Sequence, residues 1–478
     1  MSTDITDWDA STLSEHIHAR RVSCSEVMRA YLARIGRLNP TYNAIVNLAP
    51  EEHLLAQARQ CDEELARGHS RGWLHGMPQA IKDTGNALGV PSTLGSRLLA
   101  ENMPASDSVM VERMKAAGCI VIGKTNMPEL GLGSHTFNEL FGATLNAWDP
   151  TVSAGGSSGG AAVALAQRLL PVADGSDFMG SLRNPAGWNH IFGLRPSQGR
   201  VPYGPGPDVW VDQLGTEGPM ARSVRDLARL LATQAGHDPR LPLSLAEDFQ
   251  VDTLAYTPDS LRGLRVGWLG DLGGHLAMEG GILEVCEDAL RTMQDAGAQV
   301  EPLALGMDPH MLWECWLVWR RALIGPKVAA LLALAKDGQQ PKPEAMWEHE
   351  NSLKLSYMDF MRASQQRTQL HKHLLGLFEQ VDVLALPTAQ VWPFPIEQRW
   401  PQRIGERAMD TYHRWMECTI YATLAGLPAI SLPAGFHAQQ PWPMGIQLIG
   451  KPRGDLALLQ VAASYEAVRS EWLAKRPD

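Results

Sequence analysis

The chain has 478 residues, of which 45% are hydrophobic and 20% are charged, a composition typical of a globular protein with a large buried core. Its net charge of −10 disfavours a nucleic-acid backbone or an anionic membrane as the main partner. The N-terminus lacks the apolar segment of a secretory signal, and the apolar run 328–335 is too short to span a bilayer. Six scattered cysteines form no CxxC or Cys/His pattern, so we expect reduced thiols, a cytoplasmic protein, and no metal or cofactor.

The predicted elements begin with helices over about residues 1–70. Residues 12–38 carry apolar side chains at helical spacing, and Ser25 is a candidate N-cap. Between about residues 73 and 228, short apolar runs such as "CIVIG" alternate with glycine-rich loops and helical stretches such as "GGAAVALAQRLL". This alternation predicts an α/β fold with a sheet at its centre.

The second half of the chain continues the same alternation. Residues 263–304 read as strand, helix and strand, with Gly297 placed to end the helix. The segment from about 240 to 380 is variable and, beyond residue 305, mostly helical and rich in tryptophan. Strands return at "DVLALP" and "GLPAISLPAG" within 381–478, and a last helix is expected from about Asp455.

One motif matches a phosphate-binding loop. Residues 118–125, "GCIVIGKT", fit the pattern G-x-x-x-x-G-K-[ST], which works through a flexible loop followed directly by a helix. The four central residues instead favour a buried strand, and Gly118 is placed to end the preceding helix. We therefore expect no nucleotide at this motif.

Three other stretches carry candidate catalytic groups. Gly156 to Gly160 fits the G-x-S-x-G pattern around Ser158, although the polar segment before it is a poor strand. Lys82 ends a short apolar run. Ser181 lies just ahead of Asn184-Pro185, which resembles an N-cap followed by proline at the first helical position. Each stretch alone is also compatible with an ordinary turn or helix start.

Together, "GMPQAIKD", "AGGSSGG" and "SDFMGSLRNPAG" resemble the amidase signature family of serine hydrolases. Lys82 and Ser157 are 75 residues apart, and Ser157 and Ser181 are 24 residues apart. The resemblance extends to "FGLRPSQGRVP", "GTEGPMARSVRDLA" and "GLPAISLPAG", and it is most specific in residues 73–228. It implies a single α/β domain over residues 1–478, with a mixed central β-sheet covered by helices.

The resemblance also implies the site. Ser181 would be the nucleophile, Lys82 the base, and Ser157 the proton relay after a cis peptide bond at Gly156–Ser157. Serine attacks a carbonyl only when a base takes its proton, and a lysine can do so only when burial keeps it uncharged. The implied backbone donors to the oxyanion are Phe178, Met179, Gly180 and Ser181. The residues expected to support the site are Ser158, Ser176, Asp177 and Arg183.

Two positions depart from the family pattern. Met179 stands where a second consecutive glycine is common, and a positive φ there would strain its side chain. We favour the alternative that Phe178 and Met179 add apolar surface beside the nucleophile. Thr423 stands where an asparagine is expected, with no evident consequence.

The expected activity is hydrolysis of small apolar or aromatic amides, anilides or carbamates, with esters as a side activity and a monomer or homodimer acting on its own. Trp313, Trp316 and Trp319 recur at helical spacing, either as core residues or as an apolar cap over the site. The alternative function is the glutamine-hydrolysing subunit of a tRNA-dependent amidotransferase, which would need ATP and partner subunits. An inactive binding module on the same fold is a third interpretation.

Overall fold

The fold is described from a computed structural model, which covers residues 4–247, 249–336 and 338–477. The α-helices are α1 (Ala10–His18), α2 (Cys24–Tyr42), α3 (Glu51–Ala66), α4 (Val109–Ala116), α5 (Gly159–Ala166), α6 (Arg183–Trp188), α7 (Val224–Gln234), α8 (Ile282–Asp295), α9 (Pro309–Leu332), α10 (Pro343–Ser352), α11 (Tyr357–Gln380), α12 (Ile420–Ala425), α13 (Asp455–Val468) and α14 (Ser470–Leu473). None of these described helices combines the length and apolar character needed to cross a membrane.

The strands alternate with these helices along the chain. They are β1 (Ile45–Val46), β2 (Pro78–Lys82), β3 (Ile120–Thr125), β4 (Phe137–Asn138), β5 (Gly142–Ala143), β6 (Ala173–Asp177), β7 (Phe192–Arg195), β8 (Thr216–Ala221), β9 (Arg265–Trp268), β10 (Gln299–Pro302), β11 (Val383–Pro387), β12 (Arg403–Ile404), β13 (Arg407–Ala408), β14 (Ala429–Phe436) and β15 (Pro443–Ile449). Short 3₁₀ helices include η5 (Arg414–Thr419).

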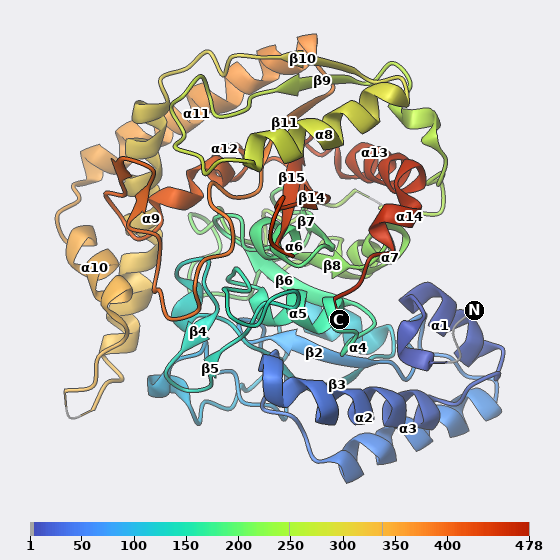
Figure 1. Cartoon of the computed structure of the whole chain (residues 1–478). Helices are drawn as coiled ribbons and strands as arrows, with labels where there is room; N and C mark the ends of the chain where they lie inside the picture. Colours follow the sequence, from blue (N-terminus) through green and yellow to red (C-terminus); the bar gives the residue numbers. More distant parts are fainter. Residues whose placement is uncertain (1–3, 248, 337, 478) are drawn as a thin grey trace.

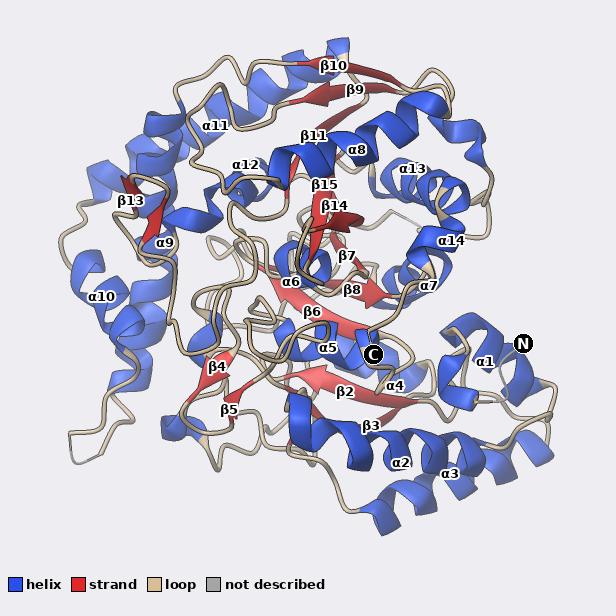
Figure 2. Ribbon diagram, viewed as in Figure 1, coloured by secondary structure: helices blue, strands red, loops and turns tan. Residues whose placement is uncertain are grey.

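Eight strands form the central sheet in the order β10-β9-β11-β15-β14-β7-β8-β6. The pairs β10/β9 and β9/β11 are parallel, and the remaining pairs are antiparallel. Figure 2 shows the strands running through the middle of the molecule with helices around them. The α/β class with a mixed central sheet is therefore confirmed.

A second sheet, β1-β3-β2, lies beside the β6 edge of the central sheet (Figure 2). The backbone N–H of Lys82, at the end of β2, donates to the carboxylate of Asp174 in β6 at 3.0 Å. The first three helices lie together at the lower right of Figure 1, and α9, α10 and α11 lie toward the left. The edge between the two sheets therefore places Lys82 near the end of β6.

Local sequence explains where several helices begin. Ser23 and Glu26 form a capping box at the start of α2, in which each side chain accepts the other residue's backbone N–H. The prediction that Ser25 is this N-cap is wrong, because the Ser25 hydroxyl instead donates to Asp62. The end of α8 is as predicted, since Gly297 follows it with a φ of +103°. The last long helix, α13, begins at Asp455 as expected.

The prediction for the phosphate-loop motif is confirmed. Ile120–Thr125 is strand β3, and Gly118 follows α4 with a φ of +102°. Lys124, in the position of the phosphate-binding lysine, is fully buried and donates to the hydroxyl of Ser92 at 2.7 Å. A strand cannot wrap its amides around a phosphate.

Candidate active site

Lys82 ends β2, a strand in which all five residues are buried. Its side-chain nitrogen Nζ donates to three hydroxyl oxygens, those of Ser157 at 2.9 Å, Ser158 at 2.8 Å and Ser176 at 2.9 Å. It also lies 3.3 Å from the carbonyl oxygen of Ser176. The structure thus brings Lys82 into direct contact with the serine expected to relay its proton.

The environment of Lys82 favours the uncharged amine. The side chain has no exposed surface. Burial lowers the pKa of Lys82 to about 7, although the carboxylates of Asp177, Asp174 and Glu217 act in the opposite direction. A substantial fraction of Lys82 is therefore neutral near pH 7 and able to accept a proton.

Ser157 lies in a glycine-rich turn that precedes α5. The Gly156–Ser157 peptide bond is cis, which is the geometry that the resemblance implies. The carbonyl of Gly156 accepts the Ser134 hydroxyl at 2.8 Å, and its N–H donates to the Asn184 side chain at 3.3 Å. Hydrogen bonds from two distant segments therefore fix the turn that presents Ser157.

Ser181 follows β6 in a tight turn that leads into α6. Its side chain is 5% exposed and lines the same cavity as Ser157 and Ser176. Gly180 has a φ of +82°, a conformation that favours glycine, whereas Met179 is not among the residues with positive φ. The backbone therefore accommodates methionine at position 179 without strain.

A buried ion pair holds this turn. Arg183 donates to both carboxylate oxygens of Asp177, at 3.0 and 2.9 Å, and neither side chain is exposed. Burial alone would raise the pKa of Asp177, but the charges of Arg183 and Arg195 hold it well below its usual range. Arg183 also donates to Thr423 at 3.3 Å, which gives that unusual residue a role in the network.

The four expected oxyanion donors are not equivalent. The N–H of Gly180 donates to the Asp177 carboxylate at 2.9 Å, so it is already occupied. The amides of Phe178, Met179 and Ser181 have no hydrogen-bond partner among the described residues. Three of the four amides are therefore the ones left to meet a substrate oxygen.

The start of α6 differs from the prediction. The helix begins at Arg183 with Leu182 as its N-cap, so Asn184 is not the N-cap and Pro185 is the third helical residue. The amides of Arg183 and Asn184 both donate to the carbonyl of Gly180, which starts the helical turn one residue earlier. Proline fits within the first turn because those N–H groups lack intrahelical partners in any case.

The cavity beside Ser181 has a volume of about 160 Å³. Phe178 lies on its wall next to the nucleophile turn. Six further apolar residues share the lining: Leu94, Leu130, Leu132, Met179, Ile324 and Met416. Its charged lining residues are Arg320 and Lys327, and no acidic side chain is among the described residues that line it. The space is thus mostly apolar with cationic groups on one wall.

The three tryptophans of α9 are core residues. Trp313, Trp316 and Trp319 are 1%, 0% and 6% exposed, and none of them lines the cavity. Trp316 nevertheless packs against Phe178, with ring centroids 5.3 Å apart. The tryptophans therefore support the cavity wall from behind, while Arg320 forms part of its surface.

Sequence patterns did not identify every residue near the site. Tyr203 and Arg320 line the cavity, and Asp174 and Glu217 act on the pKa of Lys82. Glu217 is paired with Ser176 across the β6–β8 ladder, so both side chains point to the same face of the sheet. Such neighbours come from strand pairing, which a single sequence does not specify.

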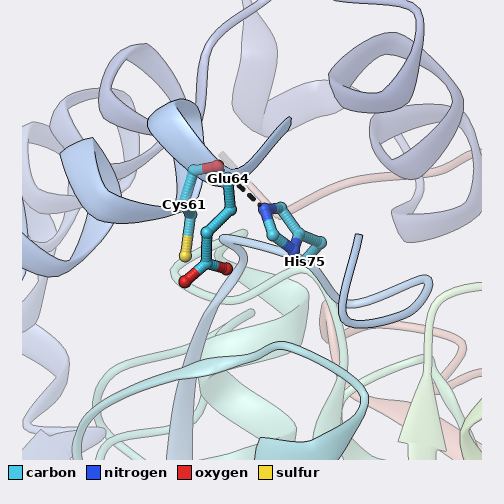
Figure 3. Close-up of side chains that lie close together, drawn as sticks. All are labelled: Cys61, Glu64 and His75. Carbon is cyan, nitrogen blue, oxygen red and sulfur yellow. Dashed lines mark hydrogen bonds between the residues drawn. The ribbon is translucent and has the colours of Figure 1, made fainter. Parts of the chain in front are cut away.

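One other cluster has metal-binding residue types. Ligand atoms of Cys61, Glu64 and His75 lie within 4.8 Å of one another (Figure 3). However, His75 contacts the Cys61 carbonyl through Nε2 at 3.0 Å and accepts the Arg71 N–H through Nδ1 at 3.1 Å. Glu64 pairs with the Arg71 guanidinium. These contacts account for the cluster as a hydrogen-bonded junction at the end of α3.

The fold and this arrangement agree with what the chain is similar to. The family model described as "Amidase" matches residues 26–459. A solved structure of a bacterial aryl acylamidase of the amidase signature family is 28% identical, with a TM-score of 0.90 over 98% of this chain and 99% of that one. A 6-aminohexanoate cyclic dimer hydrolase is 27% identical, with a TM-score of 0.85 over 100% and 99% of the two chains. The chain belongs to the amidase signature family.

Sequence relatives carry a different name. One of the subunits of the glutamyl-tRNA(Gln) amidotransferase from Chloroflexus aurantiacus is 36% identical, and the match covers 95% of each protein. The subunit of the same name from Thermosynechococcus vestitus is 33% identical over 95% of this chain and 96% of that protein. The family thus contains both amide hydrolases and amidotransferase subunits with similar overall resemblance to this chain.

Proposed function

We propose that the protein is a serine amidohydrolase in which Lys82, Ser157 and Ser181 form the catalytic triad. Ser181 attacks the substrate carbonyl carbon, and its proton passes through Ser157 to the uncharged amine of Lys82. The same route returns a proton to the leaving nitrogen, and water then hydrolyses the acyl-enzyme. The observation that carries this proposal is the 2.9 Å contact between Lys82 Nζ and Ser157 Oγ in a fully buried environment.

In this proposal, the developing oxyanion is stabilised by backbone amides of Phe178, Met179 and Ser181. The support for this assignment is that these amides lack other partners among the described residues, whereas the Gly180 amide is bonded to Asp177. Loss of one such donor costs about 3–4 kcal/mol of transition-state stabilisation in other serine hydrolases. Asp177 and Arg183 contribute indirectly by fixing the turn.

The lining of the cavity favours a small apolar or aromatic amide, anilide or carbamate as substrate. Apolar side chains surround Ser181, and no acidic group among the described lining residues is available to bind a substrate ammonium. Free glutamine carries both an ammonium and a carboxylate, and burying either without a partner is costly. Esters with the same apolar groups are expected as a side activity.

A second candidate is the glutamine-hydrolysing subunit of a tRNA-dependent amidotransferase. The names of the sequence relatives favour it, since they are 32–36% identical over almost the whole chain. This function would link the chain to partner subunits and to a tRNA-dependent reaction, in contrast to the expectation of a self-sufficient enzyme. The relatives' names therefore support the second candidate and the cavity supports the first.

The test is hydrolysis by the purified chain alone. Acetanilide, phenylacetamide, a phenyl carbamate and glutamine are each incubated without ATP or any partner. The first candidate predicts hydrolysis of the aryl compounds and little release of ammonia from glutamine. Release of ammonia from glutamine alone, with no hydrolysis of the aryl compounds, would support the second candidate instead.

A further inference from the structure

One face of α9 forms part of the cavity wall. Arg320, Ile324 and Lys327 all line the cavity, and their spacing along the helix places them on the same side. Ile324 is apolar, and Lys327 pairs with Asp212 at 2.6 Å with 40% of its side chain exposed. Arg320 is only 3% exposed, so it is a buried cation within an apolar wall.

The guanidinium of Arg320 is held in one orientation. Its Nε donates to Glu348 of α10 at 2.5 Å, and its Nη2 donates to the Tyr412 hydroxyl at 2.5 Å. Tyr412 in turn donates to the same Glu348 oxygen at 2.8 Å. The guanidinium carbon also lies 5.6 Å from the Phe178 ring centroid and 5.9 Å from that of Trp316. Charge, hydrogen bonds and rings together fix the group beside the nucleophile turn.

The remaining nitrogen, Nη1, is the atom that can meet a ligand. It has no hydrogen-bond partner among the described residues, and it is not one of the fully buried atoms that lack partners. Because Arg320 lines the cavity, Nη1 is accessible from it. Glu348 already balances the charge of Arg320, so a neutral acceptor suits Nη1 better than a second carboxylate near Glu348.

We propose that Arg320 determines substrate specificity by donating a hydrogen bond from Nη1 to a neutral acceptor on the apolar part of the amide. The inference rests on the proposed function and narrows its substrate class to aryl or apolar amides that carry an ether or carbonyl oxygen away from the scissile bond. A site built to donate to an oxygen discriminates against the analogue that lacks it, because its donor is then left unpaired.

The test uses two matched pairs of substrates. One pair is the acetanilides with 4-propyl or 4-methoxymethyl groups, and the other is the benzamides with the same substituents. The methylene next to the ring keeps the reactivity of the scissile bond nearly equal within each pair, while only the ether offers an acceptor. The wild-type enzyme should prefer the ether in at least one pair by about tenfold in kcat/KM.

Two variants locate the preference. Arg320→Met should bring the ratio within that pair close to one, and circular dichroism and thermal unfolding report whether it folds. Because this change leaves Glu348 unpaired, Arg320→Met/Glu348→Gln is the second variant. Equal rates within both pairs for the wild type, or a preference that persists in a folded variant, would overturn the inference. If none of the four compounds is hydrolysed, the proposed substrate class fails, and the inference fails with it.

Discussion

Arg183 binds both carboxylate oxygens of Asp177, and the pair is completely buried behind the nucleophile. The same carboxylate accepts the backbone N–H groups of Gly180 and Leu182, at 2.9 and 3.1 Å. One acidic side chain thus anchors the turn on both sides of Ser181, and Arg183 neutralises it. This relationship makes the geometry of the nucleophile depend on an ion pair that touches no substrate.

Removing Arg183 should destabilise the protein and inactivate it. Breaking a buried ion pair costs about 3–5 kcal/mol because the remaining charge is left without compensation. Arg183→Ala should therefore lower the free energy of unfolding in urea by that amount. The matched control is Arg362→Ala, because Arg362 pairs with Asp359 on the surface with 66% and 38% of the side chains exposed. Its cost should stay below about 1 kcal/mol, and equal costs for the two variants would contradict this account.

A side chain at position 180 should disrupt the nucleophile turn. Gly180 has a φ of +82°, and an added Cβ would lie 2.6 Å from the Thr419 methyl group. Gly180→Ala should reduce kcat/KM by roughly 10²-fold or more, since displaced oxyanion donors cost about that much. Gly274→Ala is the control, because Gly274 has a similar φ of +86° but nothing within 4 Å of an added Cβ. It should retain nearly full activity, and equal losses would assign the effect to backbone strain alone.

Met179 should influence substrate preference more than chemistry. Its side chain is 2% exposed and lies on the cavity wall, while its backbone has no positive φ that would require glycine. Met179→Gly should keep the fold and shift the ratio of kcat/KM toward bulkier substrates, measured with acetanilide against a longer acyl anilide. Loss of activity on every substrate would show that the methionine matters to the turn itself.

Burial of Lys82 should cost stability in a pH-dependent way. Its pKa falls from 10.5 to about 7 on folding, so between these values the unfolded chain holds a proton that the folded chain lacks. Stability from this group therefore rises with pH and is lowest at pH 7 and below. Lys82→Met should be inactive yet more stable at pH 7, by at most about 5 kcal/mol at 1.36 kcal/mol per pKa unit. Urea unfolding at pH 7 and pH 9.5 tests this, and an advantage for Lys82→Met that does not shrink at the higher pH would contradict it.

Much of the fold follows from local patterns. The buried run before Lys82 forms β2, the helical periodicity after residue 305 forms α9 to α11, and "DVLALP" forms β11. Local competition explains the misplaced helix starts. At α2 the capping box of Ser23 and Glu26 outweighs Ser25, and at α6 the carbonyl of Gly180 recruits two amides ahead of Pro185.

The proposed catalytic residues could be predicted from motif and spacing, but their surroundings could not. Glu217 lies opposite Ser176 because β8 pairs with β6, and Arg320 is 139 residues beyond Ser181 along the chain. Neither residue lies in a stretch that suggested chemistry. The occupied amide of Gly180 also depends on the side chain of Asp177, whose orientation no sequence pattern specifies.

The central claim is that an uncharged Lys82 activates Ser181 through Ser157. The most direct test is the rate at which a fluorophosphonate phosphonylates the purified chain between pH 5 and pH 9, with the modified residue identified by mass spectrometry. The account predicts modification of Ser181, a rate that rises with pH to a plateau above an inflection near the Lys82 pKa of about 7, and a loss of roughly 10²–10⁴-fold in Lys82→Met. Modification of another residue, or a rate at pH 5 equal to that at pH 8, would contradict it.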